Sequence, residues 1–140
     1  MSIEITGAGA NRLPVAIATF EGENRLPRLL TDVVRNDLDR SGLFRMVEMG
    51  PSPMGENYRP DFANIRYRGA DAILVGTVVS QGADRYEVRF RLYDTQKAKE
   101  LGAMAYAMNG TQVRLTGHRI ADFVYEKLTG VPGYFASRLA

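Results

Sequence analysis

The chain has 140 residues, of which 45% are hydrophobic and 24% are charged, and it contains no cysteine. These values are ordinary for one globular domain, and a chain of this length buries a full core without a metal or a disulfide. The absence of cysteine excludes disulfide bonds, cysteine-bearing zinc sites and thiol catalysis. The net charge of +2 is too small to indicate a nucleic-acid partner, and no apolar run is long enough to indicate a membrane span.

The amino terminus predicts a short strand on a flexible tether. In residues 2–6, SIEIT, the apolar Ile3 and Ile5 alternate with polar neighbours, as in a half-exposed strand. Residues 7–12, GAGANR, favour a tether over a dinucleotide fingerprint, because Arg12 stands at the third glycine position and no helix follows. The residues alone leave open whether SIEIT pairs with this chain's own sheet or adds to a sheet edge of another protein.

An apolar strand and an amphipathic helix come next. Residues 13–20, LPVAIATF, form a nearly continuous apolar run, which is typical of a strand covered on both faces. Residues 22–42 predict a helix with Asn24 as its cap, Pro27 in its first turn and Gly42 at its end. The apolar face of this helix is formed by Leu26, Leu29, Leu30, Val33, Val34 and Leu38.

The middle of the chain predicts two strands separated by a loop and a short helix. Residues 43–49 predict a strand, and residues 50–60, with three prolines and two glycines, predict a loop to which we assign no role. Residues 61–69 predict a short helix capped by Asp61. Residues 70–81 predict a second buried strand.

The last third predicts two more strands and a closing helix. Residues 85–94 alternate strictly, so that one face of this strand is buried and the other is wet. Residues 103–110 predict the last strand of a meander. Residues 111–130 predict a helix that is capped by Thr111 and ended by Gly130. The apolar stripe of this helix is formed by Val113, Ile120, Val124 and Leu128.

This order of elements predicts an α/β (α+β) fold, a mixed β-sheet with helices packed on it, in one domain. The early alternation of strand and helix favours parallel neighbours, because parallel strands need a crossover. The later strands follow one another through short turns, which favours antiparallel pairing.

No set of residues predicts catalysis. His118 is the single histidine, and Asp122 follows it one turn along the same helix. A contact between the two is compatible with helical spacing, but a structural histidine is the favoured interpretation. No nucleophile elbow, zinc-binding helix, P-loop or EF-hand pattern occurs. We therefore expect no enzymatic activity, no cofactor and no metal site.

The wet strand face carries the alternative function. Arg89, Arg91 and Tyr93 interleave basic and aromatic side chains, a pattern with which some sheets bind single-stranded RNA, and residues 66–68 could extend it. Glu87 lies on the same face. A solvated sheet face with cross-strand ion pairs is therefore the favoured interpretation.

Several stretches resemble a known family. They are residues 69–79, GADAILVGTVV; residues 86–96, YEVRFRLYDTQ; and residues 117–140, GHRIADFVYEKLTGVPGYFASRLA. They resemble the amino-terminal domain of TolB, the periplasmic protein of the Tol–Pal envelope system. The strand LPVAIATF and the helix end DLDRSGLFR, residues 37–45, resemble the opening of the same domain. The resemblance covers nearly the whole chain in order.

The resemblance implies that this α/β domain, similar in fold to the anticodon-binding domains of some tRNA synthetases, precedes a six-bladed β-propeller. It divides the chain into a flexible segment, 1–12, the domain, 13–133, and the start of a linker, 134–140, with the propeller absent from this sequence. It further implies a periplasmic protein that a signal peptide, absent here, exports, and that is peripheral to the membrane and not inserted.

The resemblance also implies a non-enzymatic adaptor that supports outer-membrane integrity and constriction at cell division, and that colicins exploit for uptake. The expected partners are the C-terminal domain of TolA and, through the propeller, the lipoprotein Pal; no nucleic acid is expected. The apolar alternation of the TolA-binding stretch is shorter here than is usual in the family. The residues that match this stretch are Ile3, Glu4, Ile5, Thr6, Gly7 and Ala8.

Overall fold

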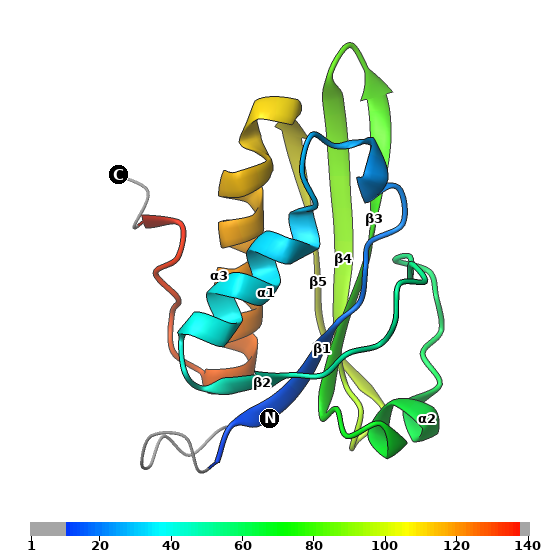
Figure 1. Ribbon diagram of the computed structural model, residues 1–140, viewed down its shortest axis with the longest axis vertical. Helices are drawn as coiled ribbons and strands as arrows, with labels where there is room; N and C mark the ends of the chain where they lie inside the picture. Colours follow the sequence, from blue (N-terminus) through cyan, green and yellow to red (C-terminus); the bar gives the residue numbers. More distant parts are fainter. Residues whose placement is uncertain (1–10, 138–140) are drawn as a thin grey trace.

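The computed structural model describes residues 11–137, which form a mixed five-stranded sheet with helices on both faces (Figure 1). The strand order is β2-β1-β3-β4-β5, with β1 parallel to both of its neighbours and the other pairs antiparallel. This confirms the predicted fold class and the predicted split between parallel and antiparallel pairing. The strands are β1 (Leu13–Ile17), β2 (Phe44–Met46), β3 (Ala72–Gly82), β4 (Arg85–Asp94) and β5 (Lys99–Asn109).

Two helices cover one face of the sheet. They are α1 (Leu30–Arg40) and α3 (Val113–Thr129), which pack against each other as well as against the strands (Figure 1). Phe20, Phe44 and Phe90 are fully buried in this layer. Most of the buried apolar side chains of the described residues belong to this cluster, so it supplies most of the hydrophobic stabilisation.

A shorter helix covers part of the opposite face. It is α2 (Phe62–Tyr67), and Asp61 caps it as predicted, by accepting a hydrogen bond from the Asn64 N–H at 3.2 Å. Ile65 of α2 packs in a small cluster with Ile73 and other residues of β1 and β3. The loop before α2 covers a further part of this face, and the part formed by β4 and β5 is open to solvent, as the alternation in β4 predicts.

The first long helix begins later than the sequence predicts. Residues Glu23–Arg25 form a separate 3-10 turn, and α1 begins only at Leu30. Asn24 therefore lies inside that turn rather than at the helix cap, and Pro27 lies outside the helix. Leu29, which the sequence assigns to the apolar face, is 41% exposed.

The other boundaries differ in smaller ways. β1 ends at Ile17 rather than at residue 20, and β5 begins at Lys99 rather than at residue 103. The entry into α3 is capped by Asn109, not Thr111: the Asn109 side chain accepts a hydrogen bond from the Thr111 N–H at 3.0 Å, in a capping box. Gly130 ends α3 in the left-handed region with φ of 78°, as predicted.

The chain after α3 folds back against that helix. The carboxylate of Asp122 accepts hydrogen bonds from the N–H groups of Phe135 at 2.7 Å and Ala136 at 3.2 Å. The ring of Phe135 meets that of Tyr125, which in turn meets Phe44 of β2. The division of the chain at residue 133 stays a prediction.

Within residues 11–137, no helix combines the length and the apolar character that crossing a bilayer requires.

Candidate interaction surfaces

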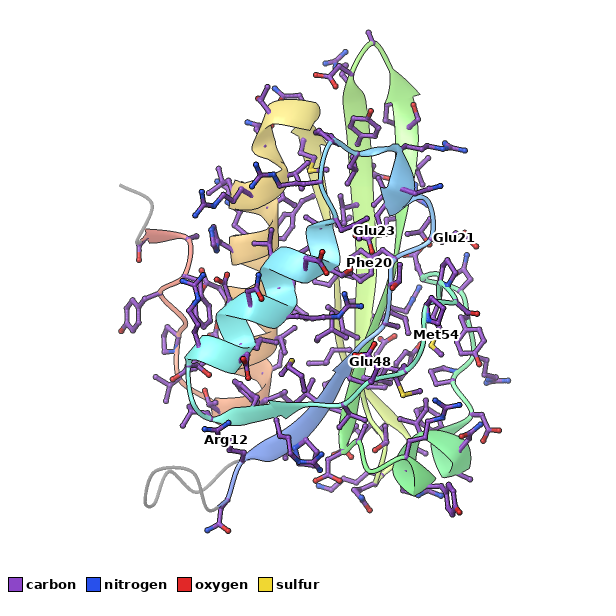
Figure 2. The ribbon with its side chains drawn as sticks, in the orientation of Figure 1. Arg12, Phe20, Glu21, Glu23, Glu48 and Met54 are labelled. Carbon is purple, nitrogen blue, oxygen red and sulfur yellow. The ribbon has the colours of Figure 1, made fainter. Side chains whose placement is uncertain are left out.

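The predicted TolA-binding residues, Ile3 to Ala8, lie outside the described residues. What the structure describes is their point of attachment, Arg12, which is exposed where β1 begins (Figure 2). The next residue is fixed, because the Leu13 N–H donates a hydrogen bond to the Leu43 carbonyl at 2.9 Å. The segment therefore joins the domain at the end of the sheet where β1 starts.

One carboxylate is buried where β1 gives way to α1. Glu23 is 1% exposed and lies close to Phe20 (Figure 2). Its Oε2 accepts hydrogen bonds from the Phe20 N–H at 3.0 Å and the Thr31 hydroxyl at 2.6 Å, and its Oε1 accepts one from the Thr31 N–H at 3.0 Å. Glu23 thus replaces the missing local cap of α1, and its negative charge faces the positive end of the helix dipole. Its role is structural.

The single histidine joins the two long helices. His118 of α3 is buried, and its Nδ1 contacts the Asp37 Oδ2 of α1. The predicted alternative partner, Asp122, is engaged instead with the chain after α3. Among residues 11–137, His, Asp and Glu side chains do not gather into a group that could hold a metal ion. The position of His118 supports the structural interpretation.

The basic side chains of β4 lie on the open face, but carboxylates accompany them. Arg89 lies 2.5 Å from Glu87, and Arg91 lies 2.8 Å from Glu100. Glu56 lies 3.9 Å from Arg89 and 4.0 Å from Arg91. The hydrogen bond that Arg91 donates to the Glu100 carboxylate raises the pKa of Arg91 above its usual value. Because the charges of Arg89 and Arg91 are already paired with carboxylates, they are less available to a nucleic-acid backbone, and we do not propose RNA binding.

The proposed extension of that face lies on and just after α2. Arg66 donates a hydrogen bond to the Thr95 carbonyl at 2.7 Å, and Arg68 donates one to the Asn64 side chain at 3.3 Å. Tyr67 is 91% exposed. Both arginines therefore serve the local structure.

The loop over residues 50–60, to which the sequence assigns no role, is bound to the sheet. The Met54 N–H donates to the Thr19 carbonyl at 2.9 Å, and the Met54 carbonyl accepts from the Gly76 N–H at 3.0 Å. Met54 (Figure 2) thus bridges the chain after β1, at Thr19, and β3, at Gly76. The Glu56 N–H donates to the Thr77 hydroxyl at 2.8 Å. Side-chain patterns do not report such backbone bridges, so the sequence does not reveal them.

Comparison with known proteins gives a consistent result. The family model described as "TolB amino-terminal domain" matches residues 1–101. The chain is 61% identical, over 136 residues, to the Tol-Pal system protein TolB of Azoarcus sp. (strain BH72), covering 97% of this chain and 32% of that protein. It is also 61% identical, over 140 residues, to the Tol-Pal system protein TolB of Aromatoleum aromaticum, covering 100% of this chain and 33% of that protein.

A solved structure agrees with the sequence relatives. The crystal structure of TolB from Acinetobacter baumannii superposes with a TM-score of 0.76 at 28% identity, covering 95% of this chain and 32% of that chain. The chain spans about a third of the length of the curated relatives it matches.

Proposed function

This chain belongs to the TolB amino-terminal domain family, and from that premise we propose that it is an adaptor domain of the Tol-Pal system, which acts by binding proteins rather than by catalysis. The observation that carries the proposal is the family match over residues 1–101, together with 61% identity to Tol-Pal system proteins over nearly the whole chain. The place of action is the periplasm. There the protein supports outer-membrane integrity and constriction at division, and colicins exploit it for uptake. Pal binds through a propeller domain that is not part of this sequence.

The segment from Ile3 to Ala8 is the proposed contact with the C-terminal domain of TolA. Ile3 and Ile5 alternate with polar residues, which suits a strand that adds to a partner's sheet edge through backbone hydrogen bonds. Ordering the tether on binding opposes association, so we expect a dissociation constant in the micromolar range or weaker.

The test is a calorimetric titration of the C-terminal domain of the cognate TolA against the 140-residue chain and a version without residues 1–10. We expect binding to the first protein and none to the second. The double variant Ile3→Asp, Ile5→Asp should also lose binding, because it removes the apolar face of the strand. The matched control Ser2→Asp adds one charge outside that face and should bind as the unchanged chain does. Equal binding by the truncated chain would exclude the segment.

A further inference from the structure

The sheet ends on one side in a long strand with an unoccupied outer edge. β5 has 11 residues and pairs with β4 on its inner side only; no strand of residues 11–137 pairs with its outer side. The other edge strand, β2, has only 3 residues. An unpaired edge offers a row of backbone N–H and C=O groups to any extended chain that reaches it.

The central part of this edge lacks the usual protection against such pairing. Edge strands are commonly guarded by charged side chains or proline. Residues 101–108, LGAMAYAM, contain neither. Met104 in the middle of this stretch is 42% exposed, and the alanines on the open face, 103, 105 and 107, leave that side free of bulky groups. The edge is therefore suited to take up another strand.

A stripe of α3 lies along the same edge on the helix-covered face. Arg119, Phe123 and Lys127 follow one another at intervals of four residues, so they share one side of the helix. A Cβ atom at Gly102 would lie 2.8 Å from the Phe123 Cζ and 3.0 Å from the Lys127 Cε, which places this part of the stripe over β5. Tyr106 lies four residues after Gly102 in β5, and the charge of Arg119 acts electrostatically on its hydroxyl group.

Neither cation of this stripe forms an ion pair with a carboxylate of residues 11–137. Every ion pair of residues 11–137 joins other side chains, and Lys127 contacts instead the ring of Phe123, with its Nζ 5.7 Å from the ring centroid. The nearby Asp122 is bound to the chain after α3. This contrasts with Arg89 and Arg91 on the open face, whose charges are balanced.

We propose that the outer edge of β5 takes up an extended segment of a partner protein that carries carboxylates on the face turned towards α3. Backbone hydrogen bonds to β5 supply the affinity, and alanines 103, 105 and 107 on the open face supply apolar contact to the alternate side chains of the segment. Attraction of the carboxylates to Arg119 and Lys127 selects acidic segments. A second copy of this chain is a poorer occupant, because twofold pairing of β5 brings two sets of these cations together. The surface is distinct from the proposed TolA-binding segment.

Three fluorescent ten-residue peptides serve as probes, with valine alternating with glutamate, lysine or glutamine, each titrated by anisotropy against the 140-residue chain. We expect the glutamate peptide to bind most tightly and the lysine peptide not to bind. Added salt should weaken the glutamate complex. Hydrogen exchange on the complex should show new protection confined to amides of β5.

Charge reversal locates the binding. The double variant Arg119→Glu, Lys127→Glu should lower the affinity for the glutamate peptide about ten-fold, because two exposed attractive charges become repulsive ones. The matched control Arg114→Glu changes a charge on the same helix off the stripe, and should alter affinity less than about two-fold. Met104→Lys places a further cation on the face turned towards α3, so it should increase the preference for the glutamate peptide over the glutamine peptide, while circular dichroism shows an unchanged fold.

Three results would overturn the proposal. One is equal affinity for the acidic and basic peptides, or no binding of either at millimolar concentration. Another is an equal loss of affinity in the Arg114→Glu control. The third is sedimentation showing a dimer of the chain that Met104→Lys dissociates, which would assign the edge to a second copy.

Discussion

The two faces of the sheet are built in different ways. The face under α1 and α3 is closed: Phe20, Phe44 and Phe90 are buried there. The opposite face is closed only where α2 and the loop before it lie, and over β4 it ends in charged side chains that pair with one another. One sheet thus combines a face that supplies most of the stability with a face that contributes less to it. We therefore expect the loss of stability caused by a substitution to depend on the face of the sheet on which the side chain lies, rather than on the strand that carries it.

The largest expected effect is on the closed face. Phe90→Ala should lower the free energy of unfolding by about 4 kcal/mol, because it leaves a cavity beneath α3. The counterpart on the other face, Ile65→Ala, should cost about 2 kcal/mol, since its smaller cluster relaxes more readily. Urea denaturation followed by circular dichroism measures both values, with Tyr67→Ala at a 91% exposed site as the control. A greater cost at Ile65 than at Phe90 would refute the comparison.

A smaller effect is expected from the buried carboxylate beside the closed face. Glu23→Gln keeps the size of the side chain but removes its charge and leaves one of its three hydrogen bonds without an acceptor. We expect a loss of about 2 kcal/mol in the free energy of unfolding. The exposed Glu48 (Figure 2) supplies the matched control, and Glu48→Gln should change stability by less than about 0.5 kcal/mol. Equal effects of the two substitutions would contradict a capping role for Glu23.

The smallest expected effect is a loss of stability at alkaline pH, to which one tyrosine on each face of the sheet contributes. Burial raises the pKa of Tyr93 on the open face and of Tyr106 on the helix-covered face. Because the folded protein holds these protons more tightly than the unfolded chain, their contribution is complete below pH about 10 and is lost as pH rises through the raised values. Urea denaturation from pH 8 to pH 11 should show this decline, and Tyr93→Phe should lessen it. A decline of the same size in that variant would assign the effect to other groups.

Much of the fold is readable from local pattern. The alternation in β4 identifies its buried and wet faces, and the apolar stripe of α3 from Val113 to Leu128 is buried as predicted. Asp61 and Gly130 act at the helix ends to which their residue types assign them. These features depend on neighbours a few positions apart, which is the range over which a single sequence is informative.

The features that local signals misplace or leave open depend on distant partners. The start of α1 is set by Glu23, eight positions before Thr31, so the local signals of Asn24 and Pro27 are overridden. His118 contacts a carboxylate 81 positions away instead of Asp122 one turn along its helix. Ion pairing on the open face is predicted from the sequence, but the carboxylates that pair with Arg91, Glu100 and Glu56, are identified only where β4, β5 and the loop meet. The proposed TolA-binding residues come from family resemblance, since a six-residue pattern has no unique physical meaning.

The clamp that Asp122 makes on the chain after α3 has a mechanical consequence. Tension applied beyond residue 137 would first meet two backbone hydrogen bonds to one carboxylate, and then the ring contacts that run from Phe135 through Tyr125 to Phe44. A pulling force on this end would therefore act on α3 and, through Tyr125 and Phe44, on the β2 edge of the sheet.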